Sequence, residues 1–379
     1  MLDHPLTQDS LAKATEEAAA IAARYAKDAE TDRRLAPEVV RAVLDAGYAR
    51  HFVPAAWNGR EGGFLDLAQA VAVLGEACAS TAWFASLTAS LGRMTAFLPA
   101  EGQAEIWADG PDTLIVGALM PIGKAEPVEG GWRLSGTWPF VSAVDFSEWA
   151  LVCAMAGPEA RFFAVPRAAY RIEDTWFPVG MRGTGSNTLV IEEVFVPSTH
   201  SFTRDRLAAG KAAGSAACHV TPLRAANGLT FAAPVLGAAR GALAAWTAYI
   251  REKTRNAPAR NGITGGSPQT HELTLARASA EIDSAQLLLE RVARVADQGA
   301  VPAAHIARNT RDCAFAVDLL VDAVNRLFHA AGTTGQSSAN AIQRFWRDAN
   351  SSSSHIVLQF EPAASAYAGH VLNEPLGEK

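Results

Sequence analysis

Cysteine is scarce in this sequence, and the cysteines present are scattered along the chain. No C-x-x-C pair occurs, so the sequence predicts neither a zinc site nor a dithiol redox centre. An isolated cysteine is more often a small buried apolar residue than a reactive one, and the scatter favours a reducing cytoplasm. The cysteines are Cys78, Cys153, Cys218 and Cys313.

Long apolar runs and an excess of basic residues are also missing. No uninterrupted apolar stretch is as long as a bilayer requires, so we expect no membrane span. The N-terminal residues carry several charges and no apolar signal-peptide core, which again favours the cytoplasm. The net charge is −6, from 33 Lys and Arg against 39 Asp and Glu. This balance argues against nucleic acid or an anionic membrane as a partner.

The sequence does have a globular composition, in three stretches of different texture. Its 379 residues are 49% hydrophobic and 19% charged, which permits a large core and two or three structural units. Apolar residues recur at helical spacing in the first stretch and again in the last, while short runs rich in Val, Ile, Trp and Phe fill the middle. We therefore predict helices at 1–112, a small β-barrel or sandwich at 113–215 and a helical bundle at 216–379.

Local signals place several element boundaries within these stretches. A helix should begin at Pro37, whose missing N–H costs nothing there, and end at Gly47, a good left-handed cap. Residues 52–63 read as a loop. Long helices should follow in the last stretch, separated by breaks at Asn261–Pro268 and Gly299–Pro302.

Two segments resemble a known superfamily. Residues 35–63 read LAPEVVRAVLDAGYARHFVPAAWNGREGG, and residues 180–197 read GMRGTGSNTLVIEEVFVP. Together with the helix–strand–helix order, they resemble the acyl-CoA dehydrogenase superfamily over nearly the whole chain. The resemblance implies an α+β, mainly α fold with an N-terminal helical domain, a central β-barrel and a C-terminal four-helix bundle. It also implies a bound flavin and a homotetramer or homodimer.

Two further segments resemble one branch of that superfamily, the two-component flavin monooxygenases. Residues 135–152 read SGTWPFVSAVDFSEWALV, and residues 342–363 read IQRFWRDANSSSSHIVLQFEPA. This branch includes p-hydroxyphenylacetate hydroxylase, dibenzothiophene monooxygenase and steroid-ring hydroxylases. The resemblance implies that Ser142, beside Trp138, hydrogen-bonds the flavin ring near N5. It also implies that His355, after Arg347 and Asp348, lies over the flavin and stabilises the C4a-peroxide.

The function implied by this resemblance is the oxygenase half of a two-component monooxygenase. The chain would bind FADH2 or FMNH2 from a separate NAD(P)H:flavin reductase, form a C4a-(hydro)peroxyflavin with O2, and hydroxylate an aromatic or polycyclic substrate such as an indole. A fixed hydroxyl and an imidazole would replace water with oriented hydrogen-bonding groups. Histidine can also give or accept a proton near neutral pH.

Other candidate site residues have plain structural alternatives. The turn at Thr184, Gly185 and Ser186 lies near substrate or flavin in the family, but glycine also permits an ordinary tight turn. Arg255 and Arg347 are candidates for flavin contacts, since arginine grips phosphate. Gly332 and Thr333 resemble a Gly-rich turn that approaches a neighbouring subunit's flavin, although a lone turn of this kind is weak evidence.

The expected substrate pocket is apolar. Its walls would come from Trp83, Leu87, Leu91 and Met120, a set that could equally be core. Relatives that hydroxylate phenols place a histidine where Leu91 stands, so activation of a phenolate by histidine is not expected here.

Three rival functions stay open at this stage. An acyl-CoA dehydrogenase would need a carboxylate base, which in many relatives is a Glu-Gly pair shortly after the Arg-Asp. Here that segment has no such pair, and Pro follows Glu361. An N- or S-oxygenase of the same fold would differ only in its substrate. A non-enzymatic flavin-fold module would have lost the motif residues that remain here.

Overall fold

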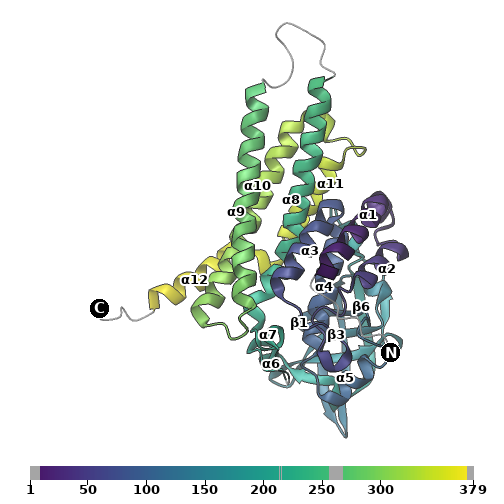
Figure 1. The fold of residues 1–379 in the computed structure, drawn as a ribbon. Coiled ribbons are helices and arrows are strands. Elements are labelled where there is room, and N and C mark those ends of the chain that lie inside the picture. Colours follow the sequence, from purple (N-terminus) through teal and green to yellow (C-terminus); the bar gives the residue numbers. More distant parts are fainter. Residues whose placement is uncertain (1–8, 213, 215, 256–267, 374–379) are drawn as a thin grey trace, which may run out of the picture.

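The structure is a computed structural model that describes residues 9–212, 214, 216–255 and 268–373 (Figure 1). Helices come first, and one mixed sheet follows. The first helices are α1 (Asp9–Asp32), α2 (Pro37–Ala46), α3 (Phe64–Ala77), α4 (Ala79–Thr95) and α5 (Ala100–Ile106). The strands are β1 (Ile115–Val128), β2 (Gly131–Val141), β3 (Trp149–Ala156), β4 (Glu159–Pro166), β5 (Arg171–Glu173), β6 (Asn187–Pro197) and β7 (Ser201–Thr203).

The second helical part contains the longest elements. Its helices are α6 (Arg204–Ala208), α7 (Ala217–Val220), α8 (Leu223–Arg255), α9 (Pro268–Ala296), α10 (Ala303–Gly335), α11 (Ala341–Ser353) and α12 (Phe360–Asn373). Short 3-10 helices occur at η1 (Ala55–Trp57), η2 (Val144–Phe146), η3 (Arg167–Ala169), η4 (Arg182–Thr184), η5 (Ser198–His200) and η6 (Ile356–Leu358). This order of helices, strands and helices is the predicted one, while the domain boundaries after residues 112 and 215 stay predictions.

Several predicted boundaries are confirmed. Helix α2 begins at Pro37 and ends against Gly47, whose φ of 91° is the left-handed conformation expected of a glycine cap. The break at Gly299–Pro302 separates α9 from α10. The break predicted at 261–268 lies almost wholly outside the described residues.

The sheet has the strand order β5-β6-β2-β1-β3-β4-β7. Strands β1 and β3 run parallel, and the other neighbours are antiparallel. The predicted barrel is this single mixed sheet, whose edge strands β5 and β7 do not pair with each other within the described residues. A bulge interrupts the β2–β6 register between Trp138 and Val141, where Phe140 takes a φ of 64°. Val141, the last residue of β2, pairs with Asn187 after this bulge, and Ser142 follows it.

Helices α8 to α11 form the bundle, and α12 projects from it (Figure 1). Helices α8 and α10 each span 33 residues, or about 50 Å at 1.5 Å per residue. By length and composition α8 could cross a membrane, but 72% of its apolar window is buried inside the protein. It is therefore the core helix of the bundle.

The first helices pack closely against α8. A Cβ added to Gly237 of α8 would lie 2.4 Å from the carbonyl oxygen of Ala72 and 2.5 Å from the Cα of Gly75. Only a residue without a side chain allows that approach. The contact sets the depth at which the N-terminal helices meet the bundle.

Candidate active site

Trp83 is the point at which the three parts of the fold meet. It lies on α4 and is only 8% exposed. Its indole Nε1–H donates to Ser142 Oγ, just beyond β2, over 3.2 Å. The edge of its ring faces His355, which follows α11, with the ring centroids 5.8 Å apart and an interplanar angle of 72°. The two predicted catalytic residues thus lie against one side chain.

Ser142 belongs to a row of hydroxyl groups. Its Oγ is 2.8 Å from Ser186 Oγ, which is 2.7 Å from Thr184 Oγ1. Thr184 donates to the carbonyl oxygen of Met181 over 2.9 Å. Gly185, with a φ of 53°, turns the chain between Thr184 and Ser186 as glycine was expected to. The predicted turn and the predicted serine therefore form one hydrogen-bonded group.

The turn is anchored to the bundle by Asp348 of α11. Its buried carboxylate accepts the backbone N–H of Met181 over 2.6 Å. Burial raises the pKa of Asp348 to about 6, against the opposing effect of that hydrogen bond. Arg347, the neighbour of Asp348, points to a different place. It forms a bidentate pair with Glu30 at 2.7 and 2.8 Å and donates to the carbonyl of Val179.

His355 is held as a neutral imidazole. Its Nδ1 accepts the backbone N–H of Val357 over 3.3 Å, so the ring proton resides on Nε2. The ring stacks on Phe231 of α8 with centroids 3.8 Å apart and planes 21° from parallel. Burial lowers the pKa of His355 to about 4. The expectation that it exchanges protons near neutral pH needs correction, because at neutral pH it offers a fixed Nε2–H donor.

Phe231 is a site residue that the sequence did not reveal. It contacts His355 by stacking and Trp83 at 5.1 Å between centroids, and it is 6% exposed. It belongs to α8, where apolar residues cover every face, so no periodicity separates it from ordinary core. Only the tertiary contact identifies it.

Comparison with known proteins agrees with this geometry. Residues 3–107 match the family described as acyl-CoA dehydrogenase, N-terminal domain, and residues 229–360 match acyl-CoA dehydrogenase, C-terminal domain. The chain is 33% identical to the FADH(2)-dependent resorcinol hydroxylase, oxygenase component, of Rhizobium sp. (strain MTP-10005), over 93% of this chain and 92% of that one.

Solved structures agree as well. The HsaA monooxygenase of M. tuberculosis superimposes with a TM-score of 0.90 at 30% identity, covering 97% of this chain and 100% of that one. XiaF from Streptomyces sp., in complex with FADH2 and glycerol, gives 0.89 at 25% identity and covers 98% and 97%. This chain is a flavin-dependent monooxygenase of the acyl-CoA dehydrogenase superfamily. The predicted fold class and enzyme class are confirmed.

In this monooxygenase, Trp138 lies inside the sheet and not beside Trp83, Ser142 and His355. This side chain is fully buried in the sheet, and its indole N–H donates to the carbonyl of Cys153 over 2.8 Å. It offers no surface to a cofactor, so its position does not support the predicted flavin contact. The indole beside Ser142 in space is Trp83, which the sequence suggested only as a pocket wall.

The expected pocket residues are not gathered in one place. Trp83 lies at the site, and Leu87 is half-buried one turn further along α4. Leu91 is buried in a separate core cluster with Val53 and Ile115. Met120, on β1, is 54% exposed. The apolar set on α4 therefore serves partly as core, the alternative that its spacing left open.

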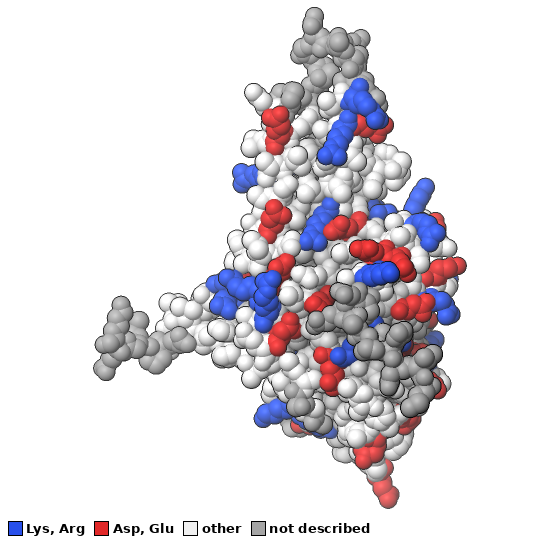
Figure 2. All heavy atoms as spheres, viewed as in Figure 1, with Lys and Arg blue, Asp and Glu red and all other residues white. Residues whose placement is uncertain are grey.

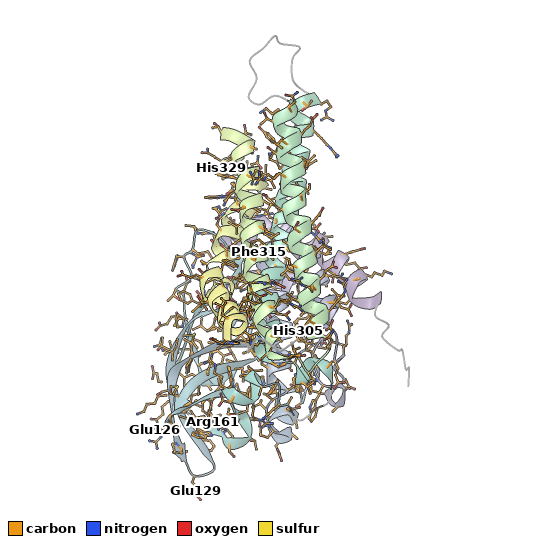
Figure 3. The ribbon with its side chains drawn as sticks, turned by 90° about the vertical axis from the view of Figure 1, so that its left-hand side faces the viewer. Glu126, Glu129, Arg161, His305, Phe315 and His329 are labelled. Carbon is orange, nitrogen blue, oxygen red and sulfur yellow. The ribbon has the colours of Figure 1, made fainter. Side chains whose placement is uncertain are left out.

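Arg255 is the last residue of α8, and Gly332 and Thr333 lie in the last turn of α10. Among the described residues, none of the hydrogen bonds or ring contacts of His355 involves them. Gly332 breaks the helical geometry of α10 with φ 64° and ψ −156°. Two other histidines, His305 and His329, lie near opposite ends of α10 on the flank of the bundle (Figure 3). The predicted flavin contacts of Arg255, Gly332 and Thr333 stay predictions.

The polar groups around Trp83, one donor and one acceptor, fit a reduced flavin, the cofactor of this enzyme family. The Nε2–H of His355 and one lone pair of Ser142 Oγ have no protein partner among the described residues, and the rings of Trp83 and Phe231 surround them. Such a set suits a planar, hydrogen-bonding ring system. Glu361, the nearest carboxylate in sequence, is exposed on α12. No cluster of three metal-ligating residues occurs in the part of the chain that the structure describes.

Proposed function

We propose that this monooxygenase takes reduced flavin from a separate NAD(P)H:flavin reductase and hydroxylates an aromatic or polycyclic ring. The observation that carries the proposal is the contact of Trp83 with both Ser142 and His355. Relatives named for hydroxylation of resorcinol, p-hydroxyphenylacetate and indole-3-acetate support the substrate class. The four cysteines are unpaired and buried, in keeping with the cytoplasm, where such a reductase would work.

The bound reduced flavin supplies the activation of oxygen, and the side chains control its surroundings. His355 would present Nε2–H to the developing negative charge on oxygen, because its Nδ1 is already engaged by Val357. Phe231 and Trp83 would exclude water from that donor, which protects a reactive oxygen species from premature release. Ser142 would fix the flavin ring at its edge.

The substrate that fits best is apolar or already electron-rich. By the resemblance, Leu91 stands where several phenol-hydroxylating relatives place a histidine, and it is buried in an apolar core cluster. Nothing at that position can remove a phenolic proton. We therefore propose a fused or indole-type ring, which needs no such activation. This matches the relative named for indole-3-acetate and differs from those named for the phenols resorcinol and p-hydroxyphenylacetate.

The decisive experiment replaces His355 by Ala and supplies reduced FAD or FMN with oxygen and an aromatic substrate. We expect the product formed per flavin oxidised to fall by about tenfold to a hundredfold, with a matching rise in hydrogen peroxide, because a lost oriented donor costs roughly 1.5–3 kcal/mol. His305→Ala on α10 is the control, since that histidine lies on the flank of the bundle (Figure 3). An unchanged product yield in His355→Ala would refute the role.

We further propose that the protein is a homotetramer or homodimer built through the bundle. Leu273 and Leu287 of α9 are 69% and 67% exposed, and Phe315 of α10 is 44% exposed. Figure 2 shows mostly uncharged atoms over α9, with scattered acidic and basic groups. A second copy would cover these side chains and bring its own α8 and α10 ends near a neighbouring site.

A further inference from the structure

The hydroxyl groups at the site form a relay, made of Thr184, Ser186 and Ser142. It runs from the carbonyl oxygen of Met181 at one end to the indole of Trp83 at the other. Both end groups have a fixed polarity. A carbonyl oxygen can only accept a hydrogen bond, and an indole N–H can only donate one. The direction of every bond between them follows.

The deduction starts at the Met181 end. Thr184 has a single hydroxyl hydrogen, and the carbonyl of Met181 takes it. Ser186 must therefore donate to Thr184, since Thr184 has no hydrogen left to give. For the same reason Ser142 must donate to Ser186. The indole of Trp83 then donates to Ser142, as an indole N–H must.

Burial keeps the relay in this state. Thr184 is 3% exposed and Ser186 is 4% exposed, so water is poorly placed to offer either hydroxyl another partner. Ser142, at the open end, has spent its hydrogen on Ser186 and one lone pair on Trp83. Only a lone pair remains, and the next partner of Ser142 must be a donor.

We propose that this relay sets the redox preference of the site, with Thr184 and Ser186 as positioning residues. Reduced flavin carries a hydrogen on N5 and can donate to Ser142. Oxidised flavin has a lone pair on N5 in place of the hydrogen. This lone pair would face the lone pair of Ser142 Oγ, so no hydrogen bond could form. The relay therefore favours the reduced form on entry and the departure of the oxidised form after turnover. This inference rests on the proposed contact between Ser142 and flavin.

The test measures dissociation constants for reduced and oxidised FAD and FMN without oxygen, together with the midpoint potential of the bound flavin. In Thr184→Val and in Ser186→Ala the hydrogen of Ser142 is released from the relay and can turn to the flavin. We expect the ratio of the dissociation constants, oxidised over reduced, to fall about tenfold, which is the effect of losing about one hydrogen bond. The midpoint potential should become about 30 mV more negative, the equivalent of tenfold for two electrons.

Two further variants separate polarity from packing. Thr184→Ser keeps the hydroxyl and should keep the wild-type preference. Thr274→Val on α9 removes a hydroxyl that also donates to a backbone carbonyl, and it should change neither affinity. Loss of the Thr184 hydroxyl leaves the Met181 carbonyl with the indole N–H of Trp176, at 3.1 Å, so the turn keeps a partner.

The outcomes distinguish the relay from the flavin contact itself. If Ser142→Ala weakens binding of reduced flavin while Thr184→Val and Ser186→Ala keep the wild-type ratio, the relay is overturned and the contact stands. If Ser142→Ala changes neither affinity, the contact is wrong and the inference fails with it. The proposal is supported if both relay variants prefer reduced flavin less strongly than the wild type does, while Thr184→Ser keeps the wild-type preference.

Discussion

Single residues determine the chemistry, and His355 shows how far a sequence can indicate one. The segment that follows Arg347 and Asp348 predicted a histidine at the flavin. It did not predict the protonation state, because that depends on Phe231 and on the Val357 N–H. The sequence also did not reveal which indole contacts Ser142. Trp138 is near Ser142 in sequence, whereas Trp83 is near it in space, across 59 residues of chain.

Replacing Phe231 by Leu should raise the pKa of His355 from about 4 toward 6.5, because the main cause of the depression is burial. NMR titration of the imidazole measures this directly. The folded protein binds this proton less readily than the unfolded chain, so His355 makes stability fall as pH drops from 6.5 to 4. The variant should lose part of that acid sensitivity. Phe315→Leu on α10 (Figure 3) is the control, and equal titration curves in wild type and Phe231→Leu would contradict the assignment.

Helices and strands position these residues, and several of their boundaries could be predicted from the sequence. The Pro37 start and Gly47 end of α2 follow from local chemistry, so they were predicted correctly. The link between α11 and the turn at Met181 was not, since a carboxylate that accepts a distant backbone N–H leaves no periodic signal. Asp348 makes that link, and it is the clearest place to test how an element supports the site.

The variant Asp348→Asn should change the pH dependence of stability. The folded pKa of Asp348 is about 6, above the usual 3.8, so the folded state holds this proton more tightly. Stability from this group is present below pH 4 and is lost as pH rises to 6, by at most about 3 kcal/mol. Asparagine cannot titrate but can still accept the Met181 N–H. Relative to wild type, the melting temperature of the variant should therefore increase between pH 4 and 7.

The matched control for that series is Asp45→Asn on α2, an exposed position. Its melting temperature should track the wild type at every pH. If the difference between Asp348→Asn and wild type is equally flat, the raised pKa of Asp348 is wrong.

At the scale of the whole molecule, the sequence predicted the order of the parts well. Contacts between subunits could not be predicted from it. The order of helices, sheet and bundle was predicted because each texture has its own period. Contacts between subunits produce no comparable periodic pattern in the sequence of one chain. Arg255 and Gly332 lie at the ends of α8 and α10, so their predicted flavin contacts stay predictions.

Leu287→Arg should break the proposed assembly. Leu287 is 67% exposed on α9, and Leu273 lies about four turns earlier on a similar face. A buried unpaired cation in a subunit interface costs several kcal/mol, enough to shift a tetramer to smaller species at micromolar concentration. Light scattering after size-exclusion chromatography gives the mass. Phe195→Arg, at an exposed position on β6, is the comparison, and an unchanged mass for Leu287→Arg would exclude this face.

The position of Trp83 has a consequence for synthesis of the chain. Its hydroxyl partner is made 59 residues later, and its imidazole partner comes only after the whole bundle, near the end of the chain. A growing chain can complete the sheet and the hydroxyl relay long before it holds His355. On the proposed role of His355, the ability to use oxygen productively is therefore the last property that the growing chain acquires.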